Sequence, residues 1–129
     1  MKCPCHSGKL YAECCAPYHE GVNPPTPLAL MRSRYSAYAL SNARYIIATT
    51  HPEHPDSSLP ASQRKQQIKH FCRTTQFKGL EIVEAEGSTV TFRAILIQQG
   101  HDASFTEKSA FSQLNGHWLY LGPLSLDQL

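Results

Sequence analysis

The sequence predicts an α+β fold in which three helices come first and cover one face of an antiparallel sheet of four strands. Eight of the nine prolines lie between Pro4 and Pro60, so the second half of the chain can form long unbroken strands. Between residues 28 and 72 apolar side chains recur every three or four positions, which indicates helices. From Phe77 onward apolar and polar residues alternate, which indicates strands.

The composition limits the class of protein. The chain has 129 residues and a mass of 14.4 kDa, with 41% hydrophobic residues, 17% charged residues and a formal net charge of +2. This is enough for one domain with a small appendage, and it excludes barrel enzymes, dinucleotide-binding enzymes and disordered chains. No apolar run approaches the ~18 residues of a membrane span or follows Met1 as a leader would, so we expect a cytoplasmic protein.

Three segments have the helical spacing. The first covers residues 28–40. The second is short, is capped by Ser41 or Asn42 and ends before Pro52. The third begins near Pro60, because proline is favoured in the first turn of a helix.

Four later stretches have the alternation of strands. They cover residues 77–85, 90–96, 105–111 and 117–121. The turns between them are expected at Gly87-Ser88, around Gly100 and at Asn115-Gly116, and Asn-Gly is the strongest two-residue hairpin signal. The alternation changes phase after Ile82, which predicts a β-bulge there.

Four of the five cysteines lie within the first fifteen residues, as a Cys-x-Cys pair followed after eight residues by a Cys-Cys pair. Zinc prefers four sulfur or nitrogen donors in a tetrahedron, and a short loop can bring these two pairs together. Disulfides fit poorly, because the cysteine number is odd and no leader peptide is evident. Four cysteines would close the coordination shell, so we expect a structural metal rather than a catalytic one.

The run from Cys3 to Cys15 resembles the SEC-C zinc motif, named for the C-terminal tail of the preprotein translocase ATPase SecA. The resemblance implies Zn²⁺ as the cofactor, with these ligands: Cys3, Cys5, Cys14 and Cys15. His6 and His19 remain alternatives to Cys15 as the fourth ligand. The resemblance also implies a protein or ribosome-associated partner, which we expect to contact Lys9, Leu10 and Tyr11.

The rest of the chain resembles the YchJ-like family of uncharacterised bacterial proteins. The matching stretches are residues 14–18, 30–38, 50–52, 107–111 and 116–120. The resemblance implies a nuclear-transport-factor-2-like (NTF2-like) cone, in which a curved four-stranded antiparallel sheet wraps around three helices. We therefore expect a zinc knuckle over residues 1–24 and an NTF2-like domain over residues 25–129.

One carboxylate stands out on the predicted sheet. Glu107 is in phase with Phe105 and Phe111, so it lies on an apolar strand face, where an unpaired charge is costly. We expect Arg34 to turn inward and form a buried ion pair with Glu107. A catalytic or ligand-binding role is the alternative, in which Tyr35 and His51 are the further cavity candidates.

Three functions follow from these features. The first hypothesis is a zinc-binding protein-interaction module without enzymatic activity, in which the cone serves as scaffold or homodimerisation unit. The alternative is a small-molecule binding protein or enzyme that uses the cone cavity around Glu107 and Arg34. The third, nucleic-acid binding, is disfavoured because residues 26–75, with seven basic and two acidic side chains, carry a modest excess of positive charge.

Overall fold

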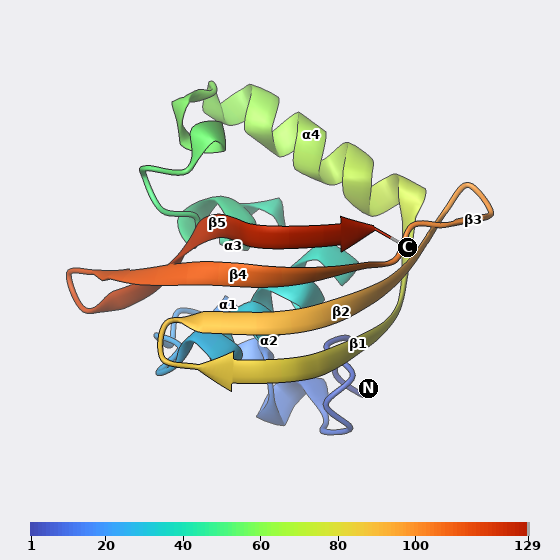
Figure 1. The fold of residues 1–129 in the computed structure, drawn as a ribbon, viewed down its shortest axis with the longest axis horizontal. Helices are drawn as coiled ribbons and strands as arrows, with labels where there is room; N and C mark the ends of the chain where they lie inside the picture. The colour runs from blue at the N-terminus through green and yellow to red at the C-terminus, as the bar shows by residue number, and fades with distance from the viewer. Residues whose placement is uncertain (129) are drawn as a thin grey trace.

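The computed structural model describes residues 1–128 and has the predicted order of helices before strands (Figure 1). Two short 3₁₀ turns, η1 and η2, accompany four helices and five strands. Their bounds are η1 Tyr11–Glu13, α1 Ala16–His19, α2 Pro27–Ala39, α3 Ala43–Ala48, η2 Pro55–Ser58, α4 Ala61–Thr74, β1 Thr75–Glu86, β2 Thr89–Gln98, β3 His101–Asp102, β4 Phe105–Leu114 and β5 His117–Gln128.

The three predicted helices correspond to α2, α3 and α4. Helices α2 and α3 each begin at a capping side chain, whereas α4 follows Pro60 and has no side-chain cap. The Thr26 side chain accepts a hydrogen bond from the Ala29 amide at 3.1 Å, and Pro27 occupies the first turn of α2. The Asn42 side chain caps α3 by accepting from the Tyr45 amide at 3.1 Å. The one-turn helix α1 was not expected from the sequence.

The sheet is antiparallel, and its main strands lie in the order β1-β2-β4-β5. The sequence analysis predicted four strands. The additional strand is β3, which has two residues. It pairs with the end of β2, because the turn at Gln99-Gly100 folds the chain back on itself. The β4–β5 hairpin has the predicted two-residue turn, and Asn115 and Gly116 both have the positive φ that such a turn requires.

Bulges curve the sheet. Val83 is the extra residue in the pairing of β1 with β2, which confirms the bulge predicted after Ile82. A second bulge lies at Lys78, and Leu121 and Leu124 are extra residues on β5 opposite β4.

The core lies between α2 and the concave face of the sheet. Leu30 on α2 is completely buried, and Val90, Phe92 and Leu96 of β2 face it in strict alternation. In Figure 1, α1, α2 and α3 lie behind the sheet, and α4 runs above it in the view. No residue of α4 is buried, so this helix covers the core without sealing it. Within residues 1–128, no helix is both long and apolar enough to cross a membrane.

Candidate functional site

The N-terminal knuckle is a tight loop followed by two short turns. Its backbone pairs Lys2 with Leu10, and the Cys3 amide donates to the Lys9 carbonyl at 2.8 Å. Gly8 has a φ of 87°, a conformation that favours glycine and lets the chain reverse. The second cysteine pair, Cys14 and Cys15, lies between η1 and α1 and is close to the first pair.

The four cysteine sulfur atoms converge. Every pair of Sγ atoms in the group Cys3, Cys5, Cys14 and Cys15 lies within 4.8 Å. The Cys5–Cys14 separation is 3.6 Å and the Cys14–Cys15 separation is 3.9 Å. Zinc–sulfur bonds in a tetrahedron place sulfur atoms about 3.8 Å apart, so the donor set fits a zinc ion. The cluster can therefore hold a metal ion.

Contacts among the cysteines and their burial shift the pKa values of the thiols in opposite directions. The contact with Cys15 lowers the pKa of the Cys5 thiol to about 4. The same contact, together with burial, raises the pKa of Cys15, and burial raises the pKa of Cys3. A bound divalent cation would stabilise all four cysteines as thiolates, because the sulfur atoms must be deprotonated to bind a metal ion.

The two histidines near the cluster have other roles. His19 Nε2 donates to the Ser33 carbonyl at 2.8 Å, so its Nδ1 is free to accept from the Tyr11 hydroxyl at 2.6 Å. Both ring nitrogens of His19 are thus engaged in joining the knuckle to α2. His6 is exposed and lies edge-on to the Tyr35 ring. Neither histidine belongs to the group of converging ligand atoms.

The three residues predicted to contact a partner differ in exposure. Lys9 is exposed, and the Leu10 side chain is 49% exposed. Tyr11 is half-buried, because its hydroxyl is directed to His19. The contact of Tyr11 with a partner stays a prediction, and it would involve the ring of Tyr11 rather than its hydroxyl group.

A cavity of about 350 Å³ lies between the sheet, α2, α3 and α4. Its walls are mainly apolar and aromatic, and three of the four predicted cavity residues, Arg34, Tyr35 and Glu107, line it. The Tyr35 hydroxyl donates to the Gly79 carbonyl at 2.8 Å, and burial raises the pKa of Tyr35 to about 12. Tyr35 is therefore a neutral wall residue.

The predicted ion pair between Arg34 and Glu107 is wrong. The Glu107 carboxylate is 9% exposed and accepts hydrogen bonds from the Ser109 hydroxyl and, at 2.8 Å, from the Tyr120 hydroxyl, both at Oε2. The Arg34 guanidinium instead lies over the ring of Tyr120, 4.6 Å from its centroid. Tyr120 thus separates the two charges.

Arg34 is held by α3 and the residues that follow it. Its Nη1 donates to the Ile46 carbonyl at 3.1 Å and to the hydroxyls of Thr49 and Thr50 at 2.7 and 3.2 Å. All three acceptors are neutral. Arg34 therefore fixes the end of α3 but keeps its positive charge without a carboxylate partner among residues 1–128.

The backbone places Tyr120 where these groups meet. Thr50 and Tyr120 form an isolated parallel bridge, in which the Tyr120 amide donates to the Thr49 carbonyl and the His51 amide donates to the Tyr120 carbonyl, both at 2.8 Å. Burial, followed by the nearby Glu107 charge, raises the pKa of the Tyr120 hydroxyl. Tyr120 is therefore a hydrogen-bond donor to Glu107 and stays protonated.

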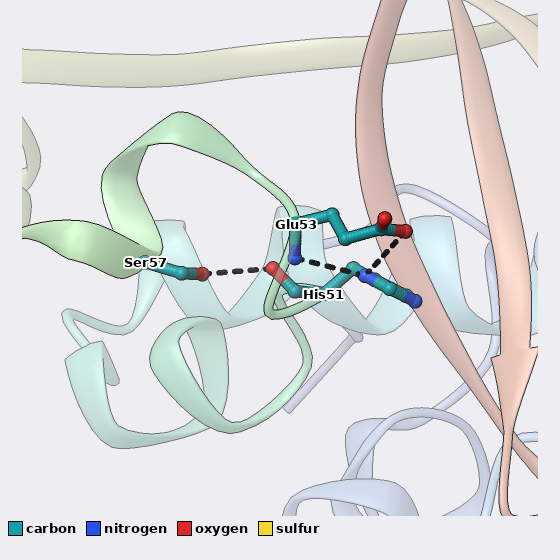
Figure 2. A network of polar contacts seen from close by, with 3 residues as sticks. All are labelled: His51, Glu53 and Ser57. Atoms are coloured by element: carbon teal, nitrogen blue, oxygen red, sulfur yellow. Dashed lines mark hydrogen bonds and ion pairs between the residues drawn. The ribbon is translucent and has the colours of Figure 1, made fainter.

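His51, the fourth predicted cavity residue, does not line the cavity. It is 7% exposed, and Figure 2 shows it organising its own loop. Its Nδ1 accepts from the Glu53 amide at 3.0 Å, and its carbonyl accepts from the Ser57 hydroxyl at 2.8 Å. The prediction that His51 reaches the cavity is wrong, because these contacts hold the ring within the loop.

Three cavity residues were missed by sequence reasoning. His54, Tyr38 and Tyr120 line the cavity but were not among the predicted cavity residues. Tyr38 could have been predicted from its spacing to Arg34, since residues four apart lie on the same face of a helix. The sequence does not indicate that His54 lines the cavity, because its loop has no periodic pattern.

The basic residues of α4 do not form one open surface. Lys65 and Arg73 are exposed, whereas Arg64 and Lys69 are half-buried, and Arg64 lines the cavity. This dispersal does not favour a nucleic-acid interface.

Helices packed on an open antiparallel sheet, preceded by a four-cysteine loop, define a protein with a SEC-C knuckle and an NTF2-like domain. The sequence matches the family described as "YchJ, middle NTF2-like domain" over residues 26–123 and the SEC-C motif over residues 2–17. The first match covers more than half of the chain, and the chain belongs to this family.

Individual relatives agree with this assignment. A UPF0225 protein of Deinococcus radiodurans is 42% identical over 121 residues, which are 92% of this chain and 85% of that protein. The solution structure of a SEC-C motif containing protein from Rhodopseudomonas palustris has a TM-score of 0.81 and 34% identity, and the match covers 98% of this chain and 100% of the other. The crystal structure of a SEC-C motif containing protein from Psychrobacter arcticus has a TM-score of 0.73 and 26% identity, covering 95% of this chain and 81% of the other.

Proposed function

We propose that the chain is a zinc-binding protein whose ligands are Cys3, Cys5, Cys14 and Cys15. The observation that carries this proposal is the convergence of the four sulfur atoms, all within 4.8 Å of one another. Soft thiolate donors in this number are typical of zinc sites that are closed to substrate. The ion then has a structural role, in that it holds a knuckle of residues 1–24 against the domain of residues 25–129.

The free thiols fit a reducing compartment. All five cysteines are unpaired in the structure. Intracellular proteins of this kind keep their thiols reduced and available to metal. This supports a cytoplasmic location for the protein.

The exposed side of the knuckle supports a second role, the recruitment of a protein partner. The backbone bridge between Lys2 and Leu10 brings two lysines together with two exposed apolar side chains. Met1 is 71% exposed and Leu10 is 49% exposed, while Lys2 and Lys9 flank them. An acidic protein surface with an apolar spot is the complementary partner.

A pull-down with the zinc-loaded full chain tests this role. The double variant Lys9→Glu, Leu10→Ser is expected to lose the partners that the wild type captures, because it reverses a charge and removes an apolar contact. The matched control is Lys78→Glu, Val83→Ser, which makes the same type of change at exposed positions on β1. Equal capture by both variants, or capture of no partner by the wild type, would contradict the recruiting role.

A further inference from the structure

The cavity has a polar corner and apolar walls. Its polar corner includes Glu107, Tyr120, Arg34, Tyr38 and His54. Other polar residues also border the cavity: Thr50, Asp56, Arg64, Gln67 and Ser109. Beyond them the walls include these apolar side chains: Met31, Ile68, Phe71, Phe77, Phe92 and Leu96. A volume of about 350 Å³ is within the range of small-molecule sites. A ligand that fits this space has an apolar body and one polar end.

One oxygen of the buried carboxylate is free to receive a ligand. Both hydrogen bonds to Glu107 end on Oε2, and none within residues 1–128 ends on Oε1. In residues 1–128 every fully buried side-chain oxygen or nitrogen has a hydrogen-bond partner. Because Oε1 has none, it is not fully buried, and it must be open to the cavity that Glu107 lines. The ligand therefore needs a hydrogen-bond donor at its polar end.

Two possible hydrogen-bond donors, His54 and Tyr38, line the same cavity. His54 Nδ1 accepts from the Asp56 amide at 3.0 Å, so the hydrogen of the neutral ring is on Nε2, which has no partner among the described residues. Burial lowers the pKa of His54, which favours this neutral form. The Tyr38 hydroxyl also has no hydrogen-bond partner within residues 1–128. The polar end of the ligand therefore needs an acceptor as well as a donor.

The charges of the cavity balance. Glu107 is 9% exposed and Arg34 is 8% exposed, and neither has an oppositely charged partner in direct contact among residues 1–128. Two further ionic side chains, the exposed Asp56 and the half-buried Arg64, also border the cavity and carry opposite charges, so the lining is neutral overall. A charged ligand would bring an uncompensated charge into this site, and burying such a charge is costly.

We propose that the cavity binds an uncharged small molecule with an aromatic or aliphatic body and one head group that both donates and accepts hydrogen bonds, such as a primary amide or an alcohol. The head donates to Glu107 Oε1 and accepts from His54 Nε2 or the Tyr38 hydroxyl. The body lies against the aromatic walls toward α4 and β1.

The test measures three probes by calorimetry or ligand-observed NMR on the zinc-loaded full chain. All three share a naphthalene body: 2-naphthamide, 2-naphthoate and 2-naphthylmethylammonium. We expect the amide to bind at least about tenfold more tightly than either ion, because each ion upsets the charge balance. Tighter or equal binding of either ion, or no binding of the amide, would overturn the proposal.

Two variants locate the binding site. Glu107→Gln removes one negative charge and leaves the cavity lining with a net positive charge, so naphthoate should gain about tenfold relative to naphthamide. Glu84→Gln, at an exposed position on β1, should leave the ranking unchanged. Ala94→Leu narrows the cavity and should weaken naphthamide binding about tenfold or more. This second variant tests the binding site even if Glu107→Gln fails to fold. Unchanged naphthamide binding by Ala94→Leu would show that the probe binds elsewhere and would overturn the proposal.

Discussion

Replacing Cys14 with serine is expected to abolish metal binding and to lower the melting temperature by about 10 °C, or about 3 kcal/mol at the transition. Cys14 is half-buried, so the substitution itself disturbs little packing. The loss comes from the zinc site, because three thiolates and a hydroxyl bind zinc far more weakly than four thiolates. Thermal unfolding with and without a chelator measures the effect, and the chelator should destabilise the wild type but not Cys14→Ser.

The fifth cysteine provides the control. Cys72 on α4 is also half-buried and lies outside the sulfur cluster. Cys72→Ser should keep both the metal and the chelator sensitivity of the wild type. If Cys14→Ser and Cys72→Ser melted alike and neither the wild type nor the variants responded to chelator, the structural role of the metal would be refuted.

Arg34→Met should destabilise the protein by about 3 kcal/mol. The substitution preserves much of the side-chain volume but removes every hydrogen bond that Arg34 makes to the end of α3. It also removes the buried positive charge that offsets the buried Glu107 carboxylate in the cavity. Urea unfolding measures the loss as a lower transition midpoint at an unchanged slope.

Arg44→Met is the matched comparison for this prediction. Arg44 is exposed on α3, and surface substitutions of this kind change stability by about 0.5 kcal/mol or less. An Arg34→Met loss no larger than that of Arg44→Met would show that the contacts of Arg34 with α3 contribute little.

The secondary structure could be predicted because it depends on local patterns. Helical spacing and capping residues indicated α2 and α3, and the Asn115-Gly116 turn fixed the β4–β5 hairpin. The same patterns missed the length of β5, since its bulges at Leu121 and Leu124 break the alternation on which strand prediction depends.

The two parts of the candidate site differ in how far the sequence reveals them. The cysteine cluster is local, so its spacing alone indicated which sulfur atoms would meet. The cavity depends on long-range placement. The alternation of strand residues predicted that Glu107 lies on the inner face of the sheet. The position of Tyr120 between Glu107 and Arg34 depends on the long-range bridge between Thr50 and Tyr120, which no local pattern indicates.

The wrong prediction for His51 concerns the loop after α3. His51 and His54 are three residues apart in a stretch without helical order, so sequence alone could not show which one faces the cavity. The amide of Glu53 holds the His51 ring within the loop, as Figure 2 shows, and His54 packs instead against the ring of Tyr120, with centroids 5.6 Å apart.

The most direct test of the central claim is a native mass spectrum of the full chain, purified without chelator or added reductant. The account predicts one zinc ion per chain with all cysteines otherwise unmodified, because four converging thiolates fill the coordination shell of a single ion. A metal-free chain, whether reduced or with its N-terminal cysteines oxidised to disulfides, would contradict the assignment of a zinc knuckle.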